Sequence, residues 1–323
     1  MGPALLSDAG TMVAQRITVP PQITVKKAPT LPELLPSWYR SLRAANRSDR
    51  TIESYKLAAD QLIVHLREQG LSLEVDTIEA DQIRGFLEQV LATRASATAR
   101  QRYASLGQLF RWLTDEEEIA TDPMAKVRPP KVIEQPVPVL SDDQLRTLIG
   151  TCQGKTFEDR RDEAVIRVLA DTGMRLGELV GLKIGDVDLD LEAAVILGKG
   201  RRLRSAPFGK ATTKALDRYL RARRNHRSAD LPWLWLGLRG RLGSTGVEQL
   251  VARRSRSAGL GRVHPHQLRH SAAHRWLAAG GSEGDLMRLM GWQSPQMLAR
   301  YGASATDQRA HAAHRRLALG DDL

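Results

Sequence analysis

Tyr301 ends the short stretch GWQSPQMLARY, and its setting permits two interpretations. Ser294 is a typical helix N-cap and Pro295 a typical first helical residue, while Met297 and Leu298 lie four and three positions before the tyrosine and share its face. A tyrosine in such a short helix is most simply a core aromatic. It is also a phenol, and a phenol can act as an oxygen nucleophile if other parts of the chain activate its target.

Attack of a phenol on a phosphodiester needs cations that neutralise the phosphate and a proton donor for the leaving oxygen. Arg175 follows a glycine at a predicted helix start, and Glu178 lies one turn further on, where it can orient the guanidinium. Lys199 stands between two glycines in a predicted hairpin turn, from which a long cationic side chain can reach across a groove. Taken singly, these residues are more simply a surface ion pair and a solvated turn lysine.

His266 and Arg269, in the sequence HPHQLRH, are three positions apart near a helix start and therefore share a face. Further histidines follow at four-residue steps, so a metal site is a rival interpretation. No carboxylate follows His266 as in a helical zinc motif, and the single cysteine, Cys152, cannot form a Cys-rich site. We therefore expect no metal or other cofactor. The neighbouring histidines are expected to be packing, supporting or loop residues: His264, His270 and His274.

The charge of the chain favours nucleic acid as the partner. The 48 basic and 37 acidic residues give a net charge of +11, and residues 199–275 hold nineteen basic residues against three acidic ones. Such a stripe suits a polyphosphate backbone, although a solvated face or an anionic membrane surface are alternatives. Arginine predominates over lysine there, which favours phosphate. The residues expected to contact DNA are Arg201, Arg202, Arg204, Lys210, Arg253, Arg254 and Arg256.

The sequence predicts two domains and a lead segment. Residues 1–30 contain prolines and little periodicity, so an extended or disordered segment is expected. Residues 31–126 repeat apolar positions at intervals of three and four, which predicts three or four helices. Residues 127–140 are expected to be a proline-rich linker. The single cysteine fits a reducing cytoplasm. No apolar run approaches the ~20 residues of a spanning helix, so we expect a soluble protein that is not exported.

Residues 141–323 form the predicted second, larger domain. Ser141 and Gln144 make a capping-box pattern, Gly173 ends a helix, and AAVILGKGRRLRSAPF is a strand, a turn and a second strand. The remaining segments are helical, and a tail helix is expected at about 303–318. The fold class is therefore mainly α (α+β), with a helical N-terminal domain and a mostly helical second domain that contains a small antiparallel hairpin or sheet.

The order and spacing of these residues, over about residues 31–315, resemble the tyrosine recombinases, or phage-type integrases. The family's catalytic positions are matched by Arg175, with Glu178 at its acidic position, and by Lys199, His266, Arg269, Trp292 and Tyr301. Each fragment is a weak signal, but the full set in family order within a basic domain is a strong one. The departure is Trp292 where many members have histidine, a substitution that the family itself shows.

The resemblance implies a role for each residue. The two arginines, Arg175 and Arg269, would hold the non-bridging oxygens of the scissile phosphate, and His266 would act as base or hydrogen-bond partner. Lys199 would protonate the leaving 5′ oxygen, and Trp292 would donate its indole N–H. The nucleophile would then form a 3′-phosphotyrosine linkage, which needs neither a metal nor a nucleotide.

The resemblance also implies partners and leaves alternatives open. Double-stranded DNA with core-type sites, a tetramer on paired sites with the tail helix docked in trans, and an accessory directionality protein are expected. The first domain would bind core-type DNA, since thirty preceding residues are too few for a complete arm-binding domain. A phage integrase is the favoured interpretation. A chromosome or plasmid dimer resolvase, a type IB topoisomerase and an inactive DNA-binding module are the alternatives.

Overall fold

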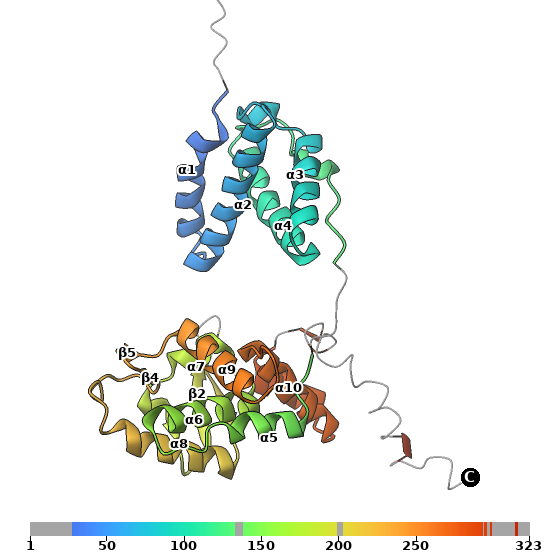
Figure 1. The fold of residues 1–323 in the computed structure, drawn as a ribbon. Coiled ribbons are helices and arrows are strands. Elements are labelled where there is room, and N and C mark those ends of the chain that lie inside the picture. Colours follow the sequence, from blue (N-terminus) through green and yellow to red (C-terminus); the bar gives the residue numbers. More distant parts are fainter. Residues whose placement is uncertain are drawn as a thin grey trace, which may run out of the picture. The chain divides into compact units, whose positions relative to one another are not determined.

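The computed structural model of this 323-residue chain describes residues 28–132, 138–198 and 203–292, together with residues 294, 295, 298, 314 and 315. The described residues form two compact units, one on each side of residues 133–137 (Figure 1). The expected lead segment and tail helix lie almost entirely outside the described residues.

The N-terminal unit is a bundle of α-helices around one apolar core (Figure 1). Its first two helices begin where the sequence supplies side-chain caps: the N–H of Thr30 donates to Glu33 Oε2 at 2.7 Å, and Ser48 Oγ accepts from the N–H of Thr51 at 3.2 Å. The largest side chains of the core include Trp38 and two phenylalanines, each 2% exposed or less. The helices are α1 (Leu31–Ala44), α2 (Asp49–Glu68), α3 (Ala80–Thr93) and α4 (Ser96–Asp115), with a 3-10 turn at Val75–Thr77.

The first residue of the expected linker, residues 127–140, belongs to the N-terminal unit, and the last belongs to the C-terminal unit, which corrects the predicted bounds. A 3-10 turn at Pro123–Lys126 packs onto the N-terminal unit, and Val127 is buried in its core and accepts a hydrogen bond from Tyr103 Oη at 3.1 Å. Leu140 is buried in the C-terminal core, and its N–H donates to Ser271 Oγ at 2.8 Å. Apolar residues between prolines can reach a core without helical periodicity, which is why the pattern gave no sign of them.

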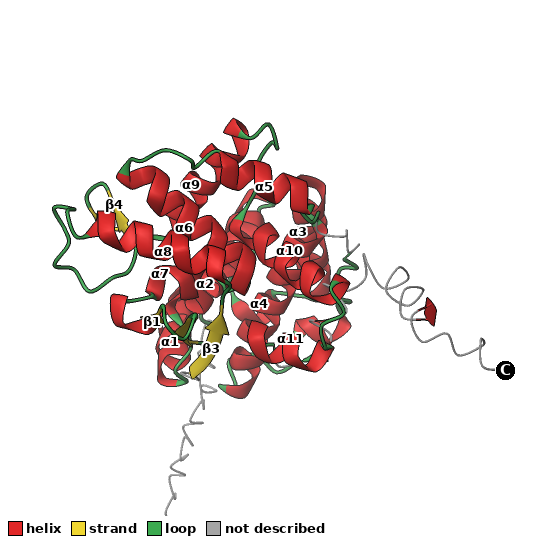
Figure 2. Cartoon of the chain, turned by 90° about the horizontal axis from the view of Figure 1, so that it is seen from below, coloured by secondary structure: helices red, strands yellow, loops and turns green. Residues whose placement is uncertain are grey.

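The C-terminal unit is mostly helical and carries a small antiparallel sheet (Figure 2), which confirms the predicted α+β class. The sheet has the strand order β1-β2-β3, and Val195 pairs with Ser205 across the hairpin. Its helices are α5 (Asp142–Gly150), α6 (Phe157–Thr172), α7 (Leu176–Gly181), α8 (Lys210–Arg223), α9 (Ser244–Ser257), α10 (Pro265–Ala278) and α11 (Glu283–Met290), with a 3-10 turn at Ile184–Asp186. Its strands are β1 (Val187–Asp188), β2 (Ala193–Leu197), β3 (Leu203–Pro207), β4 (Leu236–Gly237) and β5 (Gly240–Arg241).

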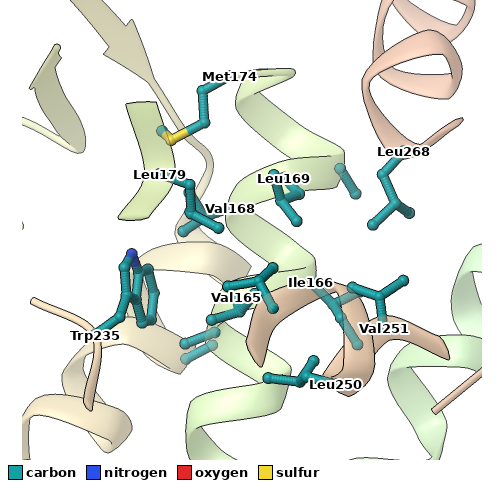
Figure 3. Packing of buried hydrophobic residues seen from close by; sticks show 14 of the residues in the cluster. Val165, Ile166, Val168, Leu169, Met174, Leu179, Trp235, Leu250, Val251 and Leu268 are labelled. Carbon is teal, nitrogen blue, oxygen red and sulfur yellow. The ribbon is translucent and has the colours of Figure 1, made fainter. Parts of the chain in front are cut away.

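Helix α6 runs through the core of this unit, and side chains from several elements converge on it (Figure 3). Leu169 of α6 is fully buried, as are Leu179 of α7 and Leu268 of α10. Each fully buried leucine contributes roughly 1.5 to 3 kcal/mol. Packing on α6 therefore fixes the relative positions of α7 and α10, whose N-terminal ends hold the candidate site residues.

Arg223, the last residue of α8, is a buried arginine that organises the chain after that helix. Its side chain is turned into the unit, and the residue is 4% exposed. The guanidinium donates to the carbonyl oxygens of Leu234 at 3.1 Å, Ala229 at 3.0 Å, Leu231 at 2.6 Å and Trp233 at 2.8 Å. One cation thereby satisfies four backbone acceptors in a segment that has little regular structure.

Replacing this guanidinium should destabilise the unit. Arg223→Met removes the guanidinium donor from the carbonyl groups of Ala229, Leu231 and Trp233, whereas Leu234 O keeps the hydroxyl of Tyr219 at 2.9 Å. We expect the free energy of unfolding to fall by about 3 kcal/mol, measured by urea denaturation. Arg221→Met on the same helix is the matched control, since Arg221 is 60% exposed in a pair with Asp217 and should cost less than about 0.5 kcal/mol. Equal losses in both variants would show that the carbonyl contacts of Arg223 are unimportant.

Candidate active site

Arg175, His266 and Arg269 line one pocket of about 490 Å³ in the C-terminal unit. Arg175 precedes the first residue of α7, and the other two lie in the first two turns of α10. His264 and Glu248 also line the pocket, Glu248 from α9. The fold thus brings together three of the residues that the sequence singled out, from segments about ninety positions apart.

The chain reversal at Gly173 places Arg175 at the pocket. Gly173 ends α6 with a φ of 57°, in the left-handed region, so the site favours glycine. Arg175 then serves as the N-cap of α7, and its N–H donates to Glu178 Oε2 at 2.8 Å. Its guanidinium donates to Glu178 Oε1 at 2.9 Å and is 41% exposed.

Arg269 is held more deeply than Arg175. The residue is 2% exposed, and its guanidinium donates to the carbonyl oxygens of Gly173 and, at 2.8 Å, of Met290. It lies over the ring of Trp292, with 5.6 Å from the guanidinium carbon to the ring centroid. Trp292 is 6% exposed, and its backbone N–H donates to the carbonyl of Met287 at 2.9 Å. The tryptophan therefore forms an apolar wall beside the second arginine.

The C-terminal end of α11 joins these arginines. Arg269 donates to Met290 O at 2.8 Å, Arg175 donates to Gly291 O at 3.1 Å, and a third arginine, Arg204 of β3, donates to Leu289 O. Three consecutive carbonyl groups at this helix end thus each accept from a different guanidinium. Such carbonyls have no partner within a helix and carry partial negative charge, so they favour cations.

Glu178 provides the carboxylate between two of these arginines. Its side chain is 7% exposed, and it also accepts from Arg204 at 2.7 Å. Burial acts to raise the pKa of Glu178, but the N–H of Arg175 and the charges of Arg204 and Arg175 outweigh it, so the pKa lies below the ordinary value. Glu178 is therefore ionised at neutral pH and orients Arg175, as the spacing of the two residues predicted.

The histidines of the HPHQLRH sequence fall into different surroundings. His266 is exposed at the pocket, whereas His270 is 3% exposed and packs edge-to-face on His266, with ring centroids 4.6 Å apart. His264 lies in the loop before α10, as expected, at the N-cap position of that helix, and it also lines the pocket, which the sequence did not indicate. Glu248 was missed as well. Its signal was present, since it is one of three acidic residues in the basic stripe.

Two of the predicted catalytic residues, Lys199 and Tyr301, lie outside the described residues, as do Arg201 and Arg202. The strands that flank Lys199 are described, and Leu197 pairs with Leu203. The roles of Lys199 and Tyr301 therefore stay predictions.

Two arginines expected to contact DNA are engaged inside the protein, which corrects the prediction for them. Arg254 is 13% exposed along its side chain and donates to Asp162 at 2.8 Å, to Asp159 at 2.8 Å and to the carbonyl of Thr151 at 2.7 Å. Arg204 is 12% exposed along its side chain and is held in the contacts above. Buried carboxylates and carbonyls separated in sequence attract these cations, which no local pattern shows. Other predicted contacts are exposed and stay predictions: Lys210, Arg256 and Arg253, which also donates to Asp162 at 2.6 Å.

Within the described part of the chain, no three His, Cys, Asp or Glu side chains gather as a metal-binding group. None of its helices is long and apolar enough to cross a membrane.

Two family models match the sequence. The model described as phage integrase family matches residues 138–308, and the model described as phage integrase, N-terminal SAM-like domain, matches residues 34–119. The tyrosine recombinase XerC of Corynebacterium efficiens is 31% identical over 254 residues, which cover 77% of this chain and 79% of the relative.

Solved structures share the fold. The Tn1549 transposon integrase in complex with transposon right end DNA aligns with a TM-score of 0.70 and 20% identity, over 90% of this chain and all of that chain. A lambda integrase tetramer bound to a Holliday junction aligns with a TM-score of 0.67 and 18% identity, over 84% of this chain and 80% of that chain.

The lowered pKa of Glu178 predicts how its contribution to stability depends on pH. Because the pKa is lower in the folded than in the unfolded state, the stabilisation is complete above the ordinary value of 4.5 and is lost as the pH falls through the folded value. Glu178→Gln should lower the free energy of unfolding by about 2 kcal/mol at pH 7, and its difference from the wild type should shrink below pH 4.5.

Denaturant unfolding between pH 7 and pH 3.5 measures this difference. Asp143→Asn is the control, since Asp143 is 92% exposed in its pair with Arg146 and should contribute under about 0.5 kcal/mol. A Glu178→Gln deficit that stays constant with pH would contradict the assignment.

Proposed function

The chain belongs to the phage integrase family of tyrosine recombinases, and from this premise we propose that it is a site-specific DNA recombinase that cleaves and rejoins DNA through a 3′-phosphotyrosine intermediate on Tyr301. The observation that carries the proposal is the pocket in which Arg175, His266 and Arg269 meet. Two guanidiniums and an imidazole in one cavity suit a group that is anionic and gains charge during reaction.

Strand cleavage begins with attack of the Tyr301 Oη on the scissile phosphorus. Arg175 and Arg269 neutralise the non-bridging oxygens, each contributing roughly 3 to 4 kcal/mol in the transition state. The phenol has an ordinary pKa of about 10 and must lose its proton during attack. His266, exposed at the pocket, accepts that proton or a hydrogen bond from the phenol.

The bond from phosphorus to the 5′ oxygen then breaks, and Lys199 supplies the proton that the leaving oxygen requires. The products are a 3′-phosphotyrosine ester and a free 5′ hydroxyl. Religation is the reverse reaction with a 5′ hydroxyl from another strand, and the ester retains the energy of the broken bond. Trp292 is buried against Arg269 behind the pocket, and its role in this mechanism is to donate its indole N–H toward the phosphate.

Recognition of DNA is assigned to both units and to more than one copy of the chain. Exposed cations such as Lys210, Arg253 and Arg256 hold phosphates, and the N-terminal helices bind the core-type site. The lambda integrase structure on a Holliday junction is a tetramer. We extend this to a tetramer on paired sites, with the C-terminal segment docked on a neighbouring copy and an accessory protein that sets direction.

A second candidate function, dimer resolution on a chromosome or plasmid, is favoured by one observation. The relative at 31% identity, aligned over 79% of its length, is a tyrosine recombinase XerC. The chemistry at the pocket would be the same in both cases. The identity of the DNA sites separates the two, because a resolvase acts on a replicon site and an integrase on a site shared with a mobile element.

Covalent capture of DNA tests the function and identifies the site. The protein is incubated with nicked duplex fragments pooled from the genome of its source, and adducts that resist detergent are isolated and sequenced. We expect the wild type to form adducts on a few sequences, and Tyr301→Phe to form none while still shifting DNA in gels, because it lacks the nucleophilic oxygen.

Tyr103→Phe is the matched control, since the Tyr103 hydroxyl contacts Val127 in the N-terminal unit, and it should form adducts. The proposed function is wrong if the wild type captures no fragment, or if Tyr301→Phe captures the same ones.

The carboxylate of Glu248 should weaken DNA binding, because it lines a pocket assigned to phosphate. Glu248→Gln is expected to tighten binding to a duplex by about fivefold, since an exposed charge interaction is worth at most about 1 kcal/mol. The dissociation constant at moderate salt measures this effect. Asp217→Asn, which removes an exposed carboxylate of α8 outside the pocket, should change it less. Equal changes would show that position in the pocket is irrelevant.

A further inference from the structure

Arg204 contacts three separate elements of the candidate site. It is the second residue of β3, where it pairs with Ile196 across the hairpin. Its guanidinium donates to Glu178 Oε2 of α7 at 2.7 Å and to the carbonyl of Leu289 in the last turn of α11. With 12% of its side chain exposed, Arg204 is more enclosed than Arg175 at 41%. The guanidinium of Arg204 therefore lies inside the unit and binds groups of the protein itself.

The backbone at Gly291 packs closely against the Arg204 side chain. Gly291 has a φ of 63°, and a Cβ there would lie 3.1 Å from Arg204 Nε and 3.5 Å from an Arg175 guanidinium nitrogen. The chain after α11 therefore passes against both arginines at a position that favours glycine. A larger residue would adopt this positive φ with strain and would press on the Arg204 side chain.

Arg204 and Gly291 each lie close in sequence to a residue that the mechanism requires. Lys199 lies five positions before Arg204 on the same hairpin, and Trp292 directly follows Gly291. Arg204 also changes the charge at Glu178. One carboxylate shared between two arginines leaves a net positive charge, whereas the same carboxylate paired with Arg175 would cancel its charge.

We propose that Arg204 is a positioning residue for strand cleavage: its charge offsets that of Glu178, so that Arg175, Glu178 and Arg204 together present a net positive charge to the phosphate, and it holds β3 against the end of α11. This role rests on the proposed recombinase function. Arg204 does not touch the phosphate itself, and it acts through Glu178, Arg175 and the α11 carbonyl.

Three variants of the full chain test this role. Arg204→Met removes the charge and both hydrogen-bond donors but keeps a side chain of similar length. Arg204→Lys keeps the charge but lacks the planar guanidinium that donates in two directions. Arg218→Met is the matched control, since Arg218 joins α8 to Glu163 of α6 at 2.9 Å in the same unit, away from the pocket.

The rate of adduct formation in a single turnover, on a nicked duplex of a captured sequence, is the first measurement. We expect Arg204→Met to be at least about tenfold slower, because small displacements of catalytic groups are costly, with Arg204→Lys intermediate and Arg218→Met at the wild-type rate. DNA affinity should stay within about twofold of the wild type, since the interaction acts on the transition state. Placed in an Arg175→Ala background, Arg204→Met should cause a much smaller further loss, because both act on one group.

Hydrogen exchange of the DNA-free protein is the second measurement, and it does not depend on activity. Arg204→Met should accelerate exchange in peptides covering residues 175–181 and 286–292, and Arg218→Met should leave both unchanged. Wild-type cleavage by Arg204→Met, or unchanged exchange in both peptides, would overturn the role while leaving the proposed function intact. An undiminished loss in the Arg175→Ala background would overturn the link through Arg175. If the wild type forms no adduct, the proposed function fails, and exchange still decides whether Arg204 holds the two elements.

Discussion

Three guanidinium groups of like charge lie close together around the C-terminal end of α11, and each of them has a carbonyl oxygen of that helix end as an acceptor. Arg204, Arg269 and Arg175 donate to Leu289, Met290 and Gly291 in turn. These carbonyl groups accept no hydrogen bond within the helix, and they carry partial negative charge. They therefore offset the electrostatic repulsion between the three guanidinium groups. These hydrogen bonds thereby hold β3, α7 and α10 against the same helix end.

The arginines of this chain divide into those that bind internal acceptors and those that remain available to a ligand. Arg254 and Arg223 are both engaged with carboxylates or carbonyls of their own unit. Arg254 binds Asp159 and Asp162 of α6, whereas Arg223 stabilises a segment that has little regular structure. Arg175 keeps an exposed guanidinium at the pocket although it is fixed by Glu178. The arginines thus serve both stability and anion binding. The net charge of +11 therefore overstates the positive charge that is available to bind DNA at the surface.

Much of the fold could be predicted because its signals are local. Ser141 with Gln144, and Gly173 at the end of α6, are capping patterns that specify a helix start and a helix end within a few residues. The hairpin of β2 and β3 follows from two apolar segments around a glycine-containing turn. The places of Val127 and Leu140 were missed, because isolated apolar residues between prolines join a core only through tertiary contact.

The sequence by itself determined which side chains are present, in what order, and on which helix starts and turns Arg175, Glu178, His266 and Arg269 would stand. Only the tertiary structure decided that Arg175, His266 and Arg269 share a pocket with His264 and Glu248, that Arg204 is an internal partner of Glu178, and that Arg254 is engaged by Asp159 and Asp162. The physical reason is that capping and periodicity act over a few residues. Burial and ion pairing act between groups that α6 and the end of α11 bring together from distant parts of the chain.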